Sequence, residues 1–359
     1  MRLKIVFLMV VISVVLAACF DGASQESEQP NHNEDGEPAI TDGYEVVATG
    51  LQIPWSIAYD GQNFYISERE GTIAKIKNGK ITREQVFLKM PLADRAEAGL
   101  LGFVLQPNKP NTAIAYYTYE SGNRIFNRVV ELRKESDGWH EENVLVDQIP
   151  SGNVHHGGRI KIGPDGKLYI TIGDAANPNI AQDLNSLGGK ILRINLDGTI
   201  PSDNPFQDSP IYSYGHRNPQ GLVWSEDGTL FSSEHGQSAH DEINVIKPGA
   251  NYGWPVIQGD ETNEGMETPL FHSGTTTWAP SGLSFADGIL YAAQLRGEGV
   301  LAFNIQNKTY EQIISNFGRI RDVFIFDGDL YFITNNTDGR GTPRPEDDKL
   351  IKISLKRGL

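Results

Sequence analysis

Cysteine is almost absent from this sequence: Cys19 is the only one in 359 residues. A chain with one cysteine forms no intrachain disulfide and carries out no dithiol redox chemistry. Positive charge is also scarce, because 31 Lys and Arg face 46 Asp and Glu and give a net charge of −15. That balance argues against nucleic acid as a partner and against a basic membrane-binding face.

Long apolar runs are absent after the N-terminus, so no later segment reaches the ~20 apolar residues of a membrane span. The N-terminus itself has a basic start and an apolar run from Ile5 to Ala18. This pattern predicts a signal peptide over residues 1–18. The run ends Leu-Ala-Ala-Cys at Cys19, which resembles a bacterial lipobox. We therefore expect lipidation of Cys19 and an extracytoplasmic protein held at the bacterial cell membrane by that lipid alone. An ordinary secretory signal is the alternative.

Residues 19–39 are polar and acidic and contain almost no aliphatic side chains. Such a composition is typical of a disordered tether. Residues 40–359 then read as one folded domain, a size that suits a barrel or propeller built from repeats.

Several enzyme signatures are also missing. The sequence has no GxxxxGK[ST], no GxSxG, and no GxGxxG that leads from a strand into a helix. Nucleotide, flavin and nicotinamide sites and the serine-hydrolase elbow therefore lack support. HxH and HExxH spacings are absent as well, which disfavours a zinc site.

One phrase repeats along the body of the chain: an alternating apolar stretch, an Asp-Gly or close equivalent, and a second alternating stretch. Asp-Gly between alternating strands is a strong hairpin signal. The turns fall at Asp60, Asp165, Asp227, Asp287 and Asp327. A degenerate copy with Pro-Asn at 107–108 fills the wide gap between the first two.

Six copies at spacings of ~40–60 residues are typical of propeller blades. We therefore predict an all-β, six-bladed β-propeller, with a short helical turn within residues 179–191 as the only helical element. A β-sandwich is the alternative, although sandwiches seldom repeat one phrase so regularly.

Four polar clusters interrupt the repeat: NVHHGGR at 153–159, GHRNPQG at 215–221, EHGQSAHDEIN at 234–244 and GRIRD at 318–322. Each lies beside a hairpin phrase, so all four can converge on one mouth of the central channel. Adjacent His155 and His156 in an extended segment would point to opposite faces and would not share a metal. The acids and carbonyls near residues 234–244 suit a hard cation such as calcium, or merely cap hairpins.

Arginines stand out in two of these clusters. Arg319 and Arg321 are two apart on a predicted strand and would project from one face. Two guanidinium groups on one face suit a ligand with planar carboxylates. Ion pairs between neighbouring blades are the alternative reading.

Five segments together resemble the soluble dehydrogenases that depend on pyrroloquinoline quinone (PQQ), the family of glucose, sorbosone and aldose sugar dehydrogenases. They are GLLGF, GGRIKIGPDGKLYITIGD, IYSYGHRNPQGL, DEINVIKPGANYGWP and RIRDV, in the family's order from about Gly50 to the C-terminus. The resemblance implies a six-bladed propeller, in agreement with the repeat count.

The resemblance also implies roles for individual residues. His155 matches the base that takes the proton from the anomeric hydroxyl as hydride passes to the quinone, a role that suits an imidazole. Asp174 matches the carboxylate that supports this histidine and the substrate. Arg217, a catalytic and cofactor-binding position, and Asn218 match residues over the quinone oxygens.

Further positions complete the implied site. Arg319 and Arg321 match the clamp on the cofactor's carboxylates. Gly236 and Gln237 match the pair whose backbone carbonyls hold a calcium ion, and Asp241 matches a further polar residue of the substrate site.

Four positions depart from the glucose dehydrogenase pattern. His235 and Glu97 each replace a glutamine near the cofactor or substrate. Arg296 stands where a cofactor-binding lysine is expected, and Gln237 where a proline is expected. These departures and the shorter chain favour the aldose sugar dehydrogenase branch.

We therefore expect a quinoprotein that oxidises aldoses to lactones with PQQ and calcium and passes electrons to an unidentified acceptor. A propeller that binds a sugar or protein without turnover is one alternative, and a calcium-dependent lactonase is another. The joint presence of His155, Arg217, Asn218, Arg319 and Arg321 favours the enzyme over a binding module.

Overall fold

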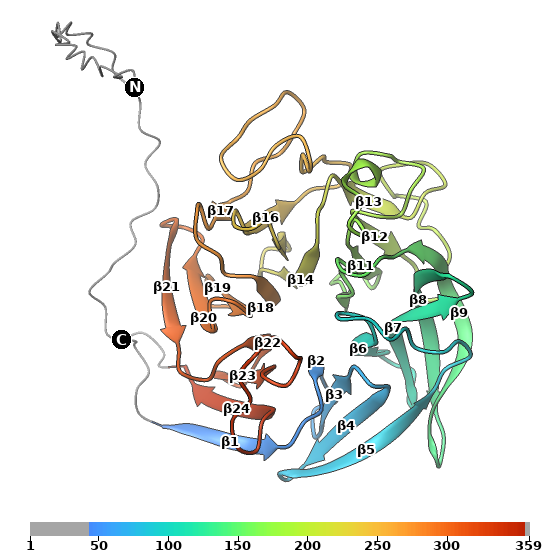
Figure 1. The fold of residues 1–359 in the computed structure, drawn as a ribbon, viewed down its shortest axis with the longest axis vertical. Helices are drawn as coiled ribbons and strands as arrows, with labels where there is room; N and C mark the ends of the chain where they lie inside the picture. The colour runs from blue at the N-terminus through green and yellow to red at the C-terminus, as the bar shows by residue number, and fades with distance from the viewer. Residues whose placement is uncertain (1–42, 356–359) are drawn as a thin grey trace, which may run out of the picture. The chain divides into compact units, whose positions relative to one another are not determined.

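The six repeats fold into six four-stranded blades arranged in a ring around a central axis (Figure 1). Four blades are separate sheets, and the other two are joined into one eight-stranded sheet. The computed structural model describes residues 43–355. The predicted six-bladed β-propeller is confirmed. The predicted signal peptide (1–18), the lipidated Cys19 and the linker (19–39) lie outside the described residues.

The first three blades follow one another along the chain, each with its strands in antiparallel order. Blade 1 consists of β2 (Pro54–Tyr59), β3 (Phe64–Glu68), β4 (Thr72–Lys77) and β5 (Lys80–Phe87). Blade 2 consists of β6 (Leu100–Leu105), β7 (Thr112–Ser121), β8 (Arg124–Lys134) and β9 (Gly138–Pro150). Blade 3 consists of β10 (Ile160–Ile162), β11 (Leu168–Ile172), β12 (Lys190–Ile194) and β13 (Ile211–Tyr214). A 3-10 helix, η1 (Pro178–Ala181), lies within the link from β11 to β12, where the short helical turn was predicted.

The last three blades complete the ring. Blade 4 consists of β14 (Pro219–Trp224), β15 (Leu230–Glu234), β16 (Glu242–Ile246) and β17 (Phe271–His272). Blade 5 consists of β18 (Pro280–Ala286), β19 (Ile289–Gln294), β20 (Gly299–Asn304) and β21 (Thr309–Ile314). Blade 6 combines β22 (Ile320–Phe326), β23 (Asp329–Thr334) and β24 (Lys349–Ser354) with β1 (Tyr44–Thr49) from the other end of the described chain.

The predicted turns connect the first and second strands of the blades. At Asp287-Gly288 and Asp327-Gly328 both residues have positive φ, between 52° and 78°. Two consecutive positive φ values define the type I′ turn that suits the twist of a hairpin. The Asp-Gly phrase therefore encodes the hairpin that begins each of these blades.

The core lies between the blades, where inner strands present apolar side chains on both faces. In β11, Leu168, Ile170 and Ile172 are each fully buried. Full burial of such a side chain contributes about 1.5–3 kcal/mol. Since neighbouring blades share these clusters, the six blades stabilise one another.

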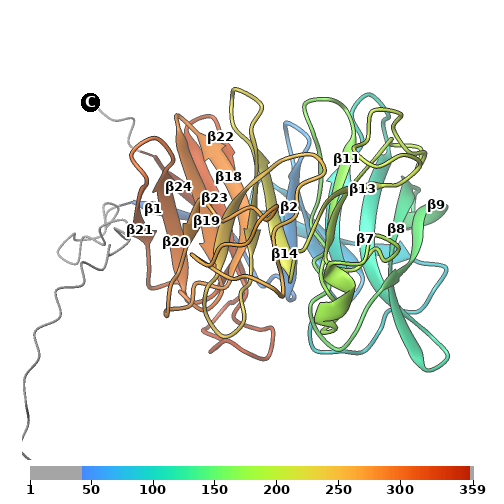
Figure 2. The ribbon, with the colours of Figure 1, turned by 90° about the horizontal axis from the view of Figure 1, so that it is seen from above.

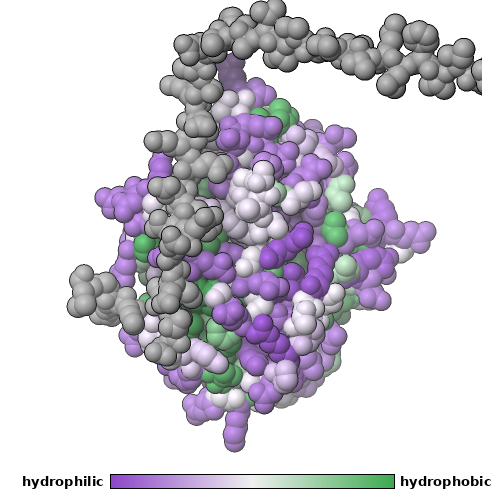
Figure 3. Space-filling model, turned by 60° about the vertical axis from the view of Figure 1, so that its left-hand side comes forward, coloured by the Kyte–Doolittle hydropathy of each residue, from purple (hydrophilic) through white to green (hydrophobic). Residues whose placement is uncertain are grey.

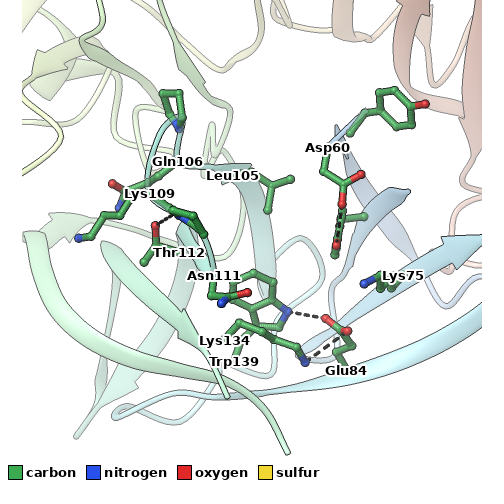
Figure 4. Close-up of a pocket in the computed structure, with 14 residues that line it drawn as sticks. Asp60, Lys75, Glu84, Leu105, Gln106, Lys109, Asn111, Thr112, Lys134 and Trp139 are labelled. Atoms are coloured by element: carbon green, nitrogen blue, oxygen red, sulfur yellow. Dashed lines mark hydrogen bonds and ion pairs between the residues drawn. The ribbon is translucent and has the colours of Figure 1, made fainter. Parts of the chain in front are cut away.

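Blades 1 and 2 are also joined at their outer edges, a feature that the sequence did not predict. The outer strands β5 and β9 pair in parallel, with Val86 opposite Trp139. A cavity of about 630 Å³ lies between these two blades (Figure 4). It is lined by residues of the first hairpin turns, such as Asp60 and Asn111, and by no predicted site residue.

The described residues contain no helix that is long and apolar enough to cross a membrane. On the face drawn in Figure 3, hydrophilic residues predominate and hydrophobic ones form small patches.

Strand direction decides where the links between strands open. Strands run between the two faces of the ring (Figure 2). Since successive strands of a blade are antiparallel, the link into the first strand and the link after the second strand open at the same face. That face, the mouth, collects polar links from all six blades, while the Asp-Gly turns lie at the opposite face.

Candidate active site

The predicted site residues all belong to links that open at the mouth. They occur before the first strand of a blade (Glu97, His155, Arg217, Asn218, Arg319), after its second strand (Asp174, His235, Gly236, Gln237, Asp241, Arg296), or early in β22 (Arg321). The repeat thus brings residues that are more than 200 positions apart in sequence to one face of the ring.

His155 and Asp174 form a buried pair at the mouth. Nδ1 of His155 lies 2.7 Å from Oδ1 of Asp174. The side chain of Asp174 is 1% exposed, whereas that of His155 is 16% exposed. With Nδ1 protonated and donating to the carboxylate, Nε2 is the nitrogen left to accept a proton. The predicted support of His155 by Asp174 is present in the structure.

His155 and its neighbour His156 do diverge, but for a reason other than the predicted one. His155 has φ of 63°, in the left-handed region, so the segment is not extended. The buried ring of His156 is bonded through Nδ1 to the hydroxyl of Ser151, at 2.9 Å. Burial lowers the pKa of His156 to about 4, and His156 is therefore neutral at pH 7.

Glu97 connects His155 to the far end of the chain. Its Oε2 accepts the backbone N–H of His155 at 3.0 Å, and its Oε1 pairs with Arg340 at 2.6 Å. Burial alone would raise the pKa of Glu97, but the charge and hydrogen bond of Arg340 and the His155 N–H lower it to about 2. Glu97 is therefore an anion that fixes the backbone of the predicted base.

Arg319 and Arg321 approach a common carboxylate, as their predicted common face requires. Arg319 Nη2 lies 2.8 Å from Oδ2 of Asp338, and Arg321 Nη2 lies 3.9 Å from the same oxygen. Burial, opposed by the charge of Asp338 and reinforced by nearby arginines, lowers the pKa of Arg321 to about 9. These contacts are not the ion pairs between neighbouring blades of the alternative reading, because Asp338 belongs to blade 6, as do both arginines.

A pocket opens between these groups. Its lining combines aromatic, acidic and basic side chains with one amide: Trp55, Arg69, Ala96, Glu97, Leu101, His156, Gly157, Gln220, His235, Leu295, Arg321, Asp338 and Arg340. Three guanidinium groups, those of Arg69, Arg321 and Arg340, face two carboxylates. The pocket therefore carries surplus positive charge that suits an anionic ligand.

Arg69 and Arg340 were missed from the sequence. Glu68 pairs with Pro54 in blade 1, and Glu234 pairs with Pro219 in the same way in blade 4. Arg69 follows Glu68 as His235 follows Glu234, so the two residues occupy the same position of the repeat. An alignment of the repeats on their hairpins would therefore have identified Arg69 as a candidate site residue. Arg340 lies in the link 335–348 after β23, which has no counterpart in the other repeats and offers no such signal.

Arg217, Asn218 and His235 adjoin the pocket. Nη1 of Arg217 donates to the carbonyl of His235 at 3.1 Å, while its buried Nε has no partner among the described residues. Oδ1 of Asn218 accepts the N–H of Gly157 at 3.0 Å. Burial lowers the pKa of His235 to about 4, so its ring is neutral at pH 7.

Gly236 and Gln237 form part of a tight link after β15. A Cβ on Gly236 would lie 2.1 Å from the carbonyl oxygen of Ala239, so only glycine fits there. Within residues 43–355, neither carbonyl oxygen accepts a hydrogen bond, which leaves both able to coordinate a cation.

Asp241 has a different role from the predicted contact with substrate. Its carboxylate is buried and accepts four hydrogen bonds from within the protein. The donors are the N–H of Gly236, the hydroxyl of Thr277 and the N–H groups of Trp278 and Ala279. Asp241 therefore holds the Gly236 link in place, and both of its oxygens accept hydrogen bonds from within the protein.

Arg296 is not brought to the pocket. Its side chain is exposed, and its neighbour Leu295 lines the pocket in its place. The structure therefore gives no support to the predicted contact between Arg296 and a cofactor.

Two acidic side chains lie close together beside the Gly236 link. Glu234 and Glu242 line a second small pocket together with Gly236. Burial, followed by the charge of Glu234, raises the pKa of Glu242 well above its usual range. A cation near these carboxylates would relieve their repulsion.

The glucose/sorbosone dehydrogenase family model matches residues 51–351. The chain belongs to that family. The family resemblance inferred from the sequence is thereby confirmed, and with it the prediction that the chain is an enzyme of the aldose and glucose dehydrogenase type.

Individual relatives agree with this family. Aldose sugar dehydrogenase YliI of Escherichia coli is 29% identical over 86% of this chain and 92% of its own length. Quinoprotein glucose dehydrogenase B of Acinetobacter calcoaceticus is 34% identical over 61% of this chain and 54% of its own length. The structure of the PQQ-bound form of aldose sugar dehydrogenase from Streptomyces coelicolor superposes with a TM-score of 0.80, at 36% identity, covering 86% of this chain and 97% of that one.

The ion pair between Glu97 and Arg340 predicts a pH-dependent contribution to stability. A carboxyl group whose pKa is depressed in the folded state stabilises the fold above its unfolded pKa, and this contribution is lost as pH falls towards the folded pKa. We expect the difference in Tm between wild type and Glu97→Gln to be largest above pH 4.5 and to shrink towards pH 2.

Thermal unfolding from pH 7 down to pH 3 measures this difference. Glu267→Gln, which removes a half-exposed partner of Lys247, is the control and should show a small difference at every pH. A Glu97→Gln difference that is constant across this range would contradict the role assigned to the pair.

Proposed function

We propose that this protein oxidises the anomeric hydroxyl of aldose sugars to the lactone, with PQQ as cofactor and calcium as a second cofactor. The observation that carries the proposal is the pair formed by Asp174 and His155, which bonds through its N–H to Glu97 of an arginine-lined pocket, in a chain of the glucose/sorbosone dehydrogenase family. The PQQ bound in the Streptomyces coelicolor relative supports the choice of cofactor.

His155 would act as the general base. Its Nδ1 proton is held by Asp174, so Nε2 takes the proton of the sugar hydroxyl. The carboxylate stabilises the imidazolium that results, and a positioned base of this kind contributes about 10²–10⁴-fold to the rate.

The arginines of the pocket fit the three carboxylates of PQQ. Arg69, Arg321 and Arg340 would face these carboxylates, with Arg319 behind them. Buried Nε groups of Arg217 and Arg319 have no acceptor among the described residues and remain able to donate to a ligand. When bound, PQQ supplies an ortho-quinone that accepts the hydride from the sugar carbon. Arg217 would hold negative charge near the quinone oxygens.

The carbonyl groups of Gly236 and Gln237 fit a calcium ion. Hard cations prefer oxygen ligands, and the side chains of Glu234 and Glu242 beside this link could supply further oxygen atoms once a cation favours their ionised forms. A calcium ion bound there would polarise a quinone carbonyl as a Lewis acid.

The lactonase alternative finds no support at the pocket. A calcium-dependent lactonase would need several carboxylate or Asn ligands around the central channel, whereas this pocket carries three arginines. A non-catalytic propeller would have no use for the buried bond between Asp174 and His155.

Reduction of an artificial electron acceptor tests the proposed reaction. The purified domain, reconstituted with PQQ and calcium, should reduce the dye when an aldose is added. Absence of dye reduction across a panel of aldoses, with folded protein and bound cofactor, would rule out this substrate class.

Two neighbouring histidines provide a matched comparison. His155→Ala should lower kcat by about 100-fold or more, because the general base is lost, while affinity for PQQ changes little. His156→Ala should lower kcat by less than about 10-fold, because this ring bonds to Ser151 and not to Asp174. Steady-state kinetics and a PQQ titration on both variants measure the difference, and equal losses of kcat would contradict the assignment.

We infer the location of the protein from its N-terminal sequence. A lipid on Cys19 would hold the enzyme at the outer face of the cell membrane, where a membrane or soluble acceptor takes the electrons. Labelled palmitate should be incorporated into the wild-type protein and not into Cys19→Ser. Equal labelling of the two proteins would refute lipidation at this residue.

A further inference from the structure

Trp254 lies at the mouth, although it belongs to a segment that begins at the opposite face of the ring. The segment 247–270, between β16 and β17, begins at the opposite face and returns to the mouth beside β13. There the backbone N–H of Trp254 donates to the carbonyl of Gly215 at 2.9 Å, and its own carbonyl accepts from Nε2 of Gln182 at 2.7 Å. The residue is 8% exposed and is fixed at both backbone groups.

The indole N–H of Trp254 is bonded to the carboxylate that supports His155. Nε1 lies 2.8 Å from Oδ2 of Asp174. The other oxygen, Oδ1, accepts from Nδ1 of His155 at 2.7 Å and from the N–H of Ala176 at 2.8 Å. Among residues 43–355, Trp254 is the only donor to Oδ2.

This bond matters because Asp174 is buried. A buried carboxylate oxygen without a donor bears a large desolvation penalty. With both oxygens engaged, the carboxylate has one orientation, in which Oδ1 faces Nδ1 of His155. That orientation selects the histidine tautomer with Nδ1 protonated and Nε2 free.

The face of the same ring lies near Arg217. The guanidinium carbon of Arg217 is 5.3 Å from the centre of the Trp254 ring, within the range of a cation–π contact. One side chain thus touches both the support of the base and the arginine beside the pocket. A phenylalanine at this position would keep an aromatic face for Arg217 but would remove the N–H together with the five-membered part of the indole.

We propose that Trp254 is a positioning residue, which fixes the tautomer of His155 by holding the carboxylate of Asp174. This inference rests on the proposed function for its effect on catalysis. Its effect on the histidine is independent of cofactor and substrate, because the chain of bonds is complete within the protein.

The direct test is the tautomer of His155 in cofactor-free protein. Nitrogen-15 NMR of the histidine rings distinguishes a protonated Nδ1 from a protonated Nε2. At neutral pH, wild type should show His155 with Nδ1 protonated, and Trp254→Phe should show a mixture of the two tautomers. Asp174→Asn is the positive control for loss of the wild-type tautomer.

Catalysis supplies the second readout. Trp254→Phe should lower kcat by about 10-fold and change the KM for sugar by less than about twofold. The acid limb of its pH–rate profile should move to higher pH, because a carboxylate that has lost a donor stabilises protonated His155 more strongly. A purely structural role would leave the shape of that profile unchanged.

The matched control is Trp224→Phe, at a half-buried tryptophan on β14 that packs on Tyr169 away from the mouth. It should leave the tautomer and the pH profile as in wild type. An unchanged tautomer in folded Trp254→Phe would overturn the inference. Failure of wild type to oxidise any aldose would instead refute the proposed function and leave the tautomer result standing.

Discussion

The pairing of β1 with β24 is the contact on which the rest of the structure depends. It joins Glu45 to Lys352 and Val46 to Ile351 and closes a chain of six blades into a ring. Without this pairing the six blades would form an open row, and blade 6 would lie far from blades 1–3. The ring instead places Arg340 of blade 6 against Glu97 and stacks Arg321 of blade 6 over Trp55 of blade 1, 5.9 Å from its ring centre. Ring closure therefore assembles the pocket as well as the fold.

Charge in the central channel gives the pocket its character. Arg159 is fully buried, pairs with Asp322 across the ring at 2.8 Å, and lies 4.2 Å from the centre of the Trp55 ring. Arg321 also contacts the Trp55 ring, and its nearest carboxylate, that of Asp338, lies 3.9 Å away and pairs more closely with Arg319. Buried cations whose charge is only partly compensated favour an anionic ligand over water. Since the rigid inner strands hold these groups, little reorganisation is needed when such a ligand binds.

The repeat allowed most of the fold to be predicted from the sequence. Asp-Gly at 287–288 and 327–328 forms type I′ turns because aspartate and glycine both tolerate positive φ. The repeat also placed the polar clusters with His155, Arg319 and Arg321 at one mouth, whereas Asp174 and the role of His155 came from the family resemblance. The repeat did not predict the parallel pairing of β5 with β9, because contacts between the outer edges of blades leave no period in the sequence.

Site residues outside the repeat were harder to predict. Arg340 and Trp254 reach the mouth through long links whose course is set by tertiary contacts, and no local pattern encodes that course. Asp241 was assigned to the substrate site through the family resemblance, and its carboxylate accepts four hydrogen bonds from within the protein. Arg296 carries the expected charge but is exposed, because Leu295 turns inward at that point. Residue type alone does not reveal which way a side chain points in an irregular link.

Titration of the cofactor-free domain with PQQ, with and without calcium, tests the central claim most directly. The account predicts saturable binding of one PQQ per chain, tighter in the presence of calcium and weakened by replacement of Arg321. Folded protein that binds no PQQ under either condition would contradict it.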